Sequence, residues 1–265
     1  MHIGVIGFGF VGGALSDCFK EKGHRILIYD KYKNIGTLEN TVKNSEIIFL
    51  CLPTLYNEKT KDYDLESLHS TCKYLNSVKY TGIIVIKSTI LPNTSEKLSS
   101  LYNLPLIHNP EFLTASTARE DFENQHHIIL GKSTMVNQVD IKKLYDFYRA
   151  MFPESDISIC SSTESEIMKL TCNCFYATKI QFFNEIYELT NNHASYNKVI
   201  ELCIMNGWIN PMHTKVPGSD GKLSFGGLCF PKDTRALNSY MERKNINHAV
   251  LNAVVEEQIK MRNND

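Results

Sequence analysis

The sequence lacks the features that mark membrane proteins and nucleic-acid-binding proteins. No apolar run reaches the roughly 18 residues that suggest a membrane span, so we expect no membrane partner. The net charge is −1, and the lysines and arginines are scattered along the chain. Because binding to a phosphate backbone requires a basic face, we expect no nucleic-acid partner. With 43% hydrophobic residues, the 265-residue chain can still bury a substantial core.

The eight cysteines have no disulfide-like or C-x-x-C spacing, and a chain of this size needs no cross-links. From Met1 the sequence runs straight into an apolar strand pattern, which leaves no space for a signal peptide. Both features predict reduced thiols and a cytoplasmic protein. We expect no bound metal, because His126 and His127 would point opposite ways in a strand and have no partner at ligand spacing.

Short β-branched runs alternate with helical patterns through the first 160 residues. The expected strands are residues 3–6, 25–29, 47–52, 83–87, 106–108 and 127–130. The expected helices are residues 14–22, 65–75 and 94–100. Such alternation predicts an α/β fold whose parallel sheet carries helices on both faces.

Beyond about residue 160 the pattern becomes helical. Residues 164–190, 197–205 and 233–260 each read as a helix, and a loop rich in glycine and proline covers residues 210–227. We therefore predict a Rossmann-type domain over residues 1–160 and a smaller helical central domain over residues 161–265.

A glycine motif follows the first expected strand and opens a helix. Gly7, Gly9 and Gly12 have the G-x-G-x-x-G spacing that allows a tight turn, close approach of pyrophosphate and close helix–strand packing. Asp30 ends the second strand, where its carboxylate can accept from the adenosine ribose. It thereby favours NAD over NADP, although Lys31 and Lys33 weaken this preference. The expected cofactor contacts are Gly7, Phe8, Gly9, Phe10, Val11, Gly12 and Asp30.

A second glycine pair precedes Cys229, in the segment SFGGLCFPKD of residues 224–233. N–H groups at the start of the following helix, together with Lys232, would lower the pKa of the thiol. A lone cysteine is more often a small buried hydrophobe. Beside a nicotinamide site, however, a thiolate suggests oxidation of an aldehyde through a thiohemiacetal.

Several sequence blocks together resemble the UDP-glucose 6-dehydrogenase family, part of the UDP-glucose/GDP-mannose dehydrogenase group. The blocks are GFGFVG from Gly7, KSTILPNT from Lys87, NPEFL from Asn109, E-x-x-K-x-x-x-N from Glu166, NE from Asn184 and FGGLCFPKD from Phe225. They occur in the family's order and span nearly the whole chain. The last block is highly specific.

The resemblance implies a role for each matching residue. Cys229 would be the nucleophile, and Lys169 and Asn173, four apart on one helix face, would hold the reacting oxygen. Glu111 would serve proton transfer and thioester hydrolysis with a water near Thr89, assisted by Asp233. Without the motifs, Lys169, Asn173 and Glu111 would be ordinary surface groups. Further implied dinucleotide contacts are Pro53, Thr54, Ser88 and Thr89. Implied substrate contacts are Glu111, Phe112, Leu113, Lys169, Asn173, Phe225, Gly226, Gly227, Cys229 and Phe230.

The expected reaction is NAD-dependent oxidation of a nucleotide sugar, with UDP-glucose to UDP-glucuronate preferred. UDP-N-acetylhexosamines and GDP-mannose are alternative substrates, and a homodimer through the central helix is expected. A further alternative is a single-step 3-hydroxyacid dehydrogenase of related fold, which would not need the cysteine.

The sequence also departs from the family pattern. It stops before the third, nucleotide-binding domain, which leaves a binding or regulatory module as another alternative. The family's second acid is replaced by Thr114-Ala115-Ser116, and an arginine of the family is replaced near His213. By contrast, residues 216–222 match the family's substrate-phosphate region.

Overall fold

The structure, a computed structural model, describes residues 1–263, which divide into two compact units. Unit 1 comprises Met1–Leu55 and Tyr63–Lys169, and unit 2 comprises Tyr56–Asp62 and the residues from Leu170 onward. The division falls inside a long helix, so the domain limits of 1–160 and 161–265 stay a prediction. Each unit is described by itself.

Unit 1 is built on a seven-stranded sheet with the strand order β2-β1-β3-β6-β7-β8-β9. The strands are β1 (His2–Ile6), β2 (Arg25–Tyr29), β3 (Ile47–Leu50), β6 (Ile83–Ile86), β7 (Leu106–His108), β8 (His127–Lys132) and β9 (Asp156–Ser161). The predicted α/β fold is confirmed, and all six predicted strands are present. The sheet is mostly parallel, and its one antiparallel pairing among the described strands is that of β8 with β7.

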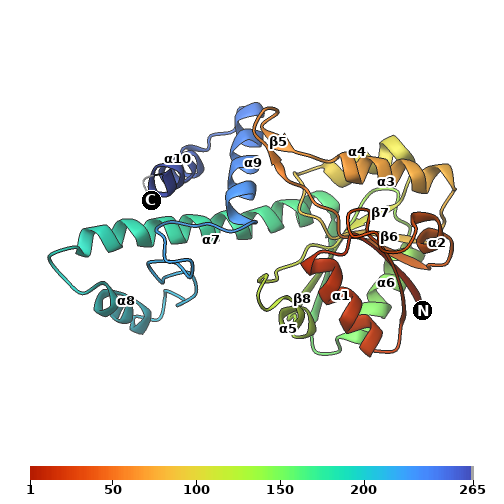
Figure 1. Cartoon of the computed structure of the whole chain (residues 1–265), viewed down its shortest axis with the longest axis horizontal. Helices are drawn as coiled ribbons and strands as arrows, with labels where there is room; N and C mark the ends of the chain where they lie inside the picture. The colour runs from red at the N-terminus through yellow and green to blue at the C-terminus, as the bar shows by residue number, and fades with distance from the viewer. Residues whose placement is uncertain (264–265) are drawn as a thin grey trace. The chain divides into compact units, whose positions relative to one another are not determined.

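Helices cover both faces of this sheet (Figure 1). The apolar cluster on one face includes residues of α1 (Phe10–Glu21), α5 (Ala118–Glu123) and α6 (Gln138–Met151). The cluster on the other face includes residues of α2 (Leu38–Lys43), α3 (Glu66–Ser77) and α4 (Thr94–Tyr102). Successive residues of β3 alternate between them: Phe49 joins the first cluster and Leu50 the second. The two-residue period of a strand explains this alternation.

Unit 2 is helical, as predicted for the second part of the chain. Its helices are α7 (Ser162–Thr190), whose first residues belong to unit 1, α8 (Tyr196–Met205), α9 (Phe230–Arg243) and α10 (Ala249–Asn263). The stretch predicted as helical over residues 233–260 holds two separate helices, α9 and α10. Asn245 adopts the left-handed conformation with φ 53°, which ends α9, and asparagine tolerates that conformation better than most residues.

A small hairpin, β4 (Tyr56–Asn57) and β5 (Asp62–Tyr63), was not predicted. Its residues 56–62 belong to unit 2 and contact α9. Arg235 pairs with Glu58, the Ser239 hydroxyl lies 3.1 Å from that of Tyr56, and Arg243 pairs with Asp62. These three α9 residues are spaced by four, so they share one face of the helix. None of the helices described in residues 1–263 is long and apolar enough to cross a membrane.

Candidate functional site

The glycine motif forms a turn whose backbone leaves no space for side chains at two of its three glycines. A Cβ at Gly7 would lie 2.4 Å from the carbonyl oxygen of Cys51, and one at Gly12 would lie 2.1 Å from that of Gly7. Gly7 also has φ +95°, a conformation that favours glycine. Gly9 differs, because within the described residues a Cβ there would meet no atom inside 4 Å.

This turn fits a dinucleotide pyrophosphate. Gly9 is the N-cap of α1 and is exposed, and among the described residues no side chain caps that helix. The first N–H groups of α1 therefore remain available to an anion, with the positive end of the helix dipole behind them. Phe10 and Val11, in the first turn of α1, are exposed and half-buried and flank this opening.

Asp30 follows β2 and holds the turn from the side. One of its carboxylate oxygens accepts from the N–H of Phe8 at 2.7 Å, and the other accepts from Tyr32 and Lys33 at 2.9 Å. Burial alone would raise the pKa of Asp30, but N–H donation, from Phe8 first, outweighs it and lowers the pKa. Asp30 is therefore a preformed carboxylate with lone pairs to spare for ribose hydroxyls.

The other predicted dinucleotide residues lie where β3 and β6 end. The Thr54 hydroxyl donates to the carbonyl of Thr89 at 2.7 Å, and the Ser88 hydroxyl donates to that of Leu52 at 2.6 Å. Thr54, Ser88 and Thr89 are buried, whereas Pro53 is exposed. The structure thus gathers these residues at the carboxyl edge of the sheet, where ligands bind in open α/β folds.

Glu111 and Lys169 meet in unit 1 and are both buried. The Lys169 ammonium donates to the carbonyl of Glu111 at 2.5 Å and lies 3.4 Å from its carboxylate. The ammonium also lies 4.8 Å from the ring centre of Phe112, and the Glu111 carboxylate accepts from the N–H of Leu113 at 2.7 Å. Residues 111–113 therefore surround the lysine with oxygen and aromatic groups.

Three buried side chains that the sequence did not single out hold this segment in place. Lys87 donates to the side-chain oxygen of Asn109 at 2.9 Å and to the carbonyl of Pro110 at 3.3 Å, and the Tyr148 hydroxyl donates to the same Asn109 oxygen. Burial lowers the pKa of Lys87 to about 8, and the charge of Lys169 adds to this effect. In the sequence, the available signal for Lys87 was its position as the first residue of the KSTILPNT block.

The second group of predicted residues lies in unit 2 around the start of α9. Cys229 is the N-cap of α9 and is half-buried. Its carbonyl accepts from the N–H of Asp233, whose buried carboxylate accepts from Asn173 at 2.6 Å and pairs with Lys232. Cys229 does begin a helix, and the Lys232 ammonium pairs with the Asp233 carboxylate.

The segment before Cys229 changes from buried to exposed. Phe225 is buried against Ala177 and Val254, whereas Gly227, with φ +79°, is exposed. Phe230 follows the cysteine, and its ring lies 5.7 Å from that of His213. His213, next to which the sequence lacks the family arginine, therefore lies beside the first turn of α9.

The predicted site residues thus form two groups, each internally connected. Unit 1 holds the dinucleotide turn, the ends of β3 and β6, Glu111 and Lys169, and unit 2 holds Asn173, the segment of residues 224–230 and Asp233. Within residues 1–263, no group of three or more histidine, cysteine, aspartate or glutamate side chains could hold a metal.

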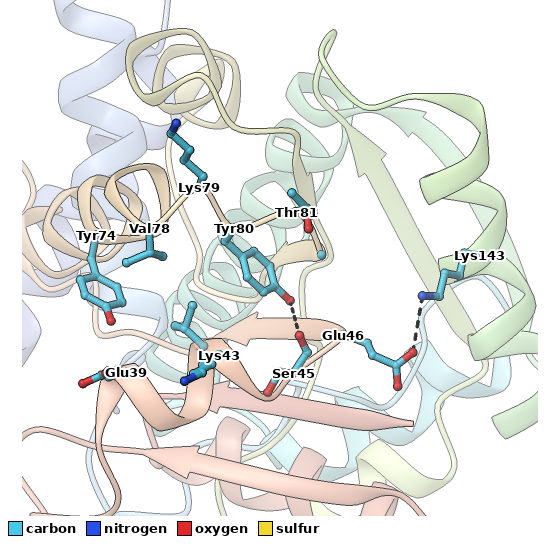
Figure 2. A pocket seen from close by; sticks show the side chains of 12 residues that line it. Glu39, Lys43, Ser45, Glu46, Tyr74, Val78, Lys79, Tyr80, Thr81 and Lys143 are labelled. Carbon is cyan, nitrogen blue, oxygen red and sulfur yellow. Dashed lines mark hydrogen bonds and ion pairs between the residues drawn. The ribbon is translucent and has the colours of Figure 1, made fainter.

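A cavity of about 580 Å³ in unit 1 has a lining of its own (Figure 2). Ser45 and Glu46 precede β3, and Tyr80 precedes β6, so the cavity lies at the amino edge of the parallel strands. The Tyr80 hydroxyl donates to the carbonyl of Ser45, and Lys143 pairs with Glu46. The lining includes none of the predicted site residues, so the cavity has no part in the site above.

Two family models match the chain. Residues 30–149 match the NAD binding domain of the UDP-glucose/GDP-mannose dehydrogenase family, and residues 163–258 match its central domain. NAD is therefore the cofactor.

Named relatives agree with these models. The chain is 25% identical over 312 residues to GDP-mannose 6-dehydrogenase of Pseudomonas aeruginosa, covering 96% of this chain and 67% of that protein. It is 26% identical over 305 residues to UDP-glucose 6-dehydrogenase TuaD of Bacillus subtilis, covering 98% and 63%. This chain therefore spans about two thirds of the length of these relatives.

A solved structure shares the fold. It is a UDP-glucose dehydrogenase from the archaeon Pyrobaculum islandicum, with a TM-score of 0.86 and 23% identity. The superposition covers 98% of this chain and 68% of that one. At this identity, the likeness concerns the fold alone.

Proposed function

Because this chain belongs to the UDP-glucose/GDP-mannose dehydrogenase family, we propose that it oxidises the C6 alcohol of a nucleotide sugar to a carboxylate in two NAD-dependent steps. The preferred substrate is UDP-glucose and the product UDP-glucuronate. One observation carries the proposal: Cys229 begins α9, and Asp233 one turn later binds Asn173 of α7. Lys169, one turn before Asn173 in α7, binds Glu111.

In the first oxidation, the proton of the C6 hydroxyl passes to the Glu111 carboxylate through a water near Thr89, and the chain holds the oxygen. When bound, NAD⁺ accepts one hydride at each of the two oxidation steps. Lys169 and Asn173 both carry N–H donors that stabilise negative charge developing on the sugar oxygen. Burial of Lys169 strengthens this effect, because a charge in a low-dielectric environment is poorly screened.

The thiol of Cys229 then captures the aldehyde. Its thiolate forms a C–S bond to the carbonyl carbon, and the carbonyl electron pair moves to the oxygen that Lys169 and Asn173 hold. Loss of the second hydride from this carbon leaves a thioester. Water, deprotonated by Glu111, adds to the thioester and expels the thiolate, which yields the carboxylate. The covalent bond prevents escape of the aldehyde between the steps.

The stoichiometry of the reaction tests this proposal. The protein is incubated with NAD⁺ and UDP-glucose, a UDP-N-acetylhexosamine or GDP-mannose, and NADH and sugar acid are both measured. Two NADH per acid are expected, with UDP-glucose turned over fastest. One NADH per sugar and no acid would instead identify a single-step dehydrogenase. No turnover of any of these substrates, with NAD still bound, would identify a binding or regulatory module.

We also propose a homodimer formed through the helical part of the chain. Phe175, Phe182 and Leu189 of α7 are each more than half exposed and are spaced by seven, which places them on one helix face. Exposed apolar stripes of this kind mark interfaces between proteins. Light scattering should give twice the chain mass of 30.2 kDa, and Phe182→Glu should return it to the single value.

A further inference from the structure

We propose that Arg262, with Gln258, is a positioning residue for the thiol loop, which we define as residues 224–229. The role of the thiol itself rests on the proposed function above. Both residues lie in the last two turns of α10 (Ala249–Asn263), far along the chain from Cys229 and outside every block that resembles the family. The inference is built on contacts within unit 2 alone.

Ser224 begins the thiol loop and forms hydrogen bonds with three side chains. It is buried and adopts the left-handed conformation with φ 58°, which is strained for a residue with a side chain. Its N–H donates to the side-chain oxygen of Asn184 at 2.8 Å, and its hydroxyl donates to Gln181 at 2.5 Å. Its carbonyl accepts from Arg262 at 2.9 Å. Side chains of α7 and α10 together therefore maintain this backbone conformation.

The Arg262 guanidinium joins two loops through different nitrogens. One nitrogen donates to the carbonyl of Ser224, and the other donates to the carboxylate of Asp220 at 2.6 Å. Asp220 lies in residues 216–222, the segment that matches the family's substrate-phosphate region. A planar guanidinium can make both contacts at once, whereas an ammonium presents a single nitrogen. Arg262 therefore sets the spacing between the two loops.

Gly226 shows how closely the guanidinium packs on the thiol loop. A Cβ at Gly226 would lie 2.9 to 3.0 Å from three atoms of the Arg262 guanidinium. The preceding carbonyl, that of Phe225, accepts from Gln258 at 3.3 Å. Residues 224–226 are thus held by α10, and only Gly227 and Leu228 separate them from Cys229. A displacement of residues 224–226 is therefore expected to move the thiol.

The first test measures the loop without any substrate. Arg262→Met and Gln258→Leu are compared with Lys260→Met, which removes an exposed lysine of the same helix. Hydrogen–deuterium exchange is followed for peptides covering residues 216–229. Loss of a charge-assisted hydrogen bond should speed exchange there about 10-fold in Arg262→Met, less in Gln258→Leu and not at all in Lys260→Met. Exchange in α8 should not change.

The second test separates positioning from simple support of the fold. In Arg262→Met, kcat for the nucleotide sugar should fall about 10-fold or more, because misplacement of a nucleophile by a fraction of an ångström slows attack. The KM for NAD should stay within about 2-fold, because the dinucleotide turn lies in unit 1. Arg262→Lys keeps the charge opposite Asp220 and should restore part of the kcat.

The outcomes distinguish this inference from the proposed function. Faster exchange at residues 216–229 together with a selective loss of kcat supports it. If no variant turns over any nucleotide sugar, faster exchange still supports control of the loop by α10, and the proposed function alone fails. Wild-type exchange and wild-type kcat in Arg262→Met would overturn the inference. If Arg262→Met fails to fold, Arg262→Lys and Gln258→Leu decide by the same two measurements.

Discussion

Two glycine-containing turns precede helices in this chain, and they are held in different ways. The dinucleotide turn before α1 is shaped mainly by close backbone packing, because Gly7 approaches the carbonyl oxygen of Cys51 and Gly12 that of Gly7, and the Asp30 carboxylate adds a hydrogen bond from the N–H of Phe8. The thiol loop before α9 is held by side chains, chiefly those of Gln181, Asn184 and Arg262. The first arrangement depends mainly on backbone packing against the ends of neighbouring strands, and the second depends on side chains of two other helices.

This difference matches the demands of the two sites. A pyrophosphate is bound by N–H groups, so a turn that excludes side chains is sufficient. A nucleophile must be aimed at one carbon atom. The first turn of α9 holds the Cys229 carbonyl, whereas Gly227 and Leu228 before it are exposed, so on that side the loop depends on contacts from other helices. The following experiments sharpen or break the comparison, beginning with the largest expected effect.

Cys229→Ser should lower the rate of sugar acid formation about 10³-fold or more, because a hydroxyl at this position lacks the nucleophilicity of a thiolate. Binding of NAD, measured by calorimetry, should match the wild type. The matched control is Cys203→Ser, on α8, which should retain full turnover. Acid formed at the wild-type rate by Cys229→Ser would remove the chemical role of the thiol loop.

Gly12→Ala should destabilise unit 1 by about 2 kcal/mol, because its Cβ would overlap the carbonyl oxygen of Gly7. In Gly9→Ala, the new Cβ meets no described atom within 4 Å, so the free energy of unfolding should fall by about 1 kcal/mol or less. The main effect of this variant should be weaker binding of NAD. Chemical denaturation and NAD titration measure the two effects. Equal losses of stability in both variants would contradict the view that backbone packing holds this turn.

Asp30→Asn should weaken NAD binding about 10-fold and reduce the preference for NAD over NADP. The variant keeps one of the two acceptor oxygens but loses the other, together with the charge that favours ribose hydroxyls and repels a 2′-phosphate. Asp17→Asn, on the exposed side of α1, is the control. An unchanged ratio of the two affinities, measured by titration with each dinucleotide, would show that Asp30 supports the turn without reading the ribose.

Glu166 offers a test of side-chain anchoring inside unit 1. This α7 carboxylate accepts from the N–H groups of Ser95 and Thr94 at the start of α4. Burial raises its pKa from 4.5 to about 7 despite those donors. Between these values the folded state binds more protons than the unfolded state, so stability falls as pH rises through the window.

Glu166→Gln removes this titration. The free energy of unfolding of the wild type, minus that of the variant, should therefore decrease as the pH is raised from about 4.5 to about 7. Urea denaturation at several pH values measures it. A difference that stays constant across this range would show that Glu166 keeps an ordinary pKa.

The sequence predicts much of unit 1 because its signals are local. Six strands and the turn at Gly7 follow from β-branched runs and glycine spacing. The antiparallel return at β8 and the break at Asn245 could not be read in the same way, because several conformations satisfy those short segments. The assignment of Glu111 and Lys169 came from resemblance, since neither residue is unusual by itself.

The supporting residues are the ones that pattern reasoning missed. Lys87 and Tyr148 meet at Asn109 from distant parts of the chain, and Arg262 reaches Ser224 across 38 positions. No periodicity links such residues, and only the tertiary structure brings them together. Long-range side-chain contacts thus hold the chemical groups, whereas close backbone packing, together with Asp30, shapes the dinucleotide turn.

Direct detection of the covalent intermediate tests the central claim most simply. The protein is mixed with NAD⁺ and UDP-glucose, quenched in acid within the first turnovers and digested. The mass of the peptide that contains Cys229 is then measured by mass spectrometry. The account predicts that this peptide carries the mass of the oxidised nucleotide sugar as a thioester, and that the adduct disappears in Cys229→Ser. Full production of acid with an unmodified Cys229 peptide at every quench time would contradict it.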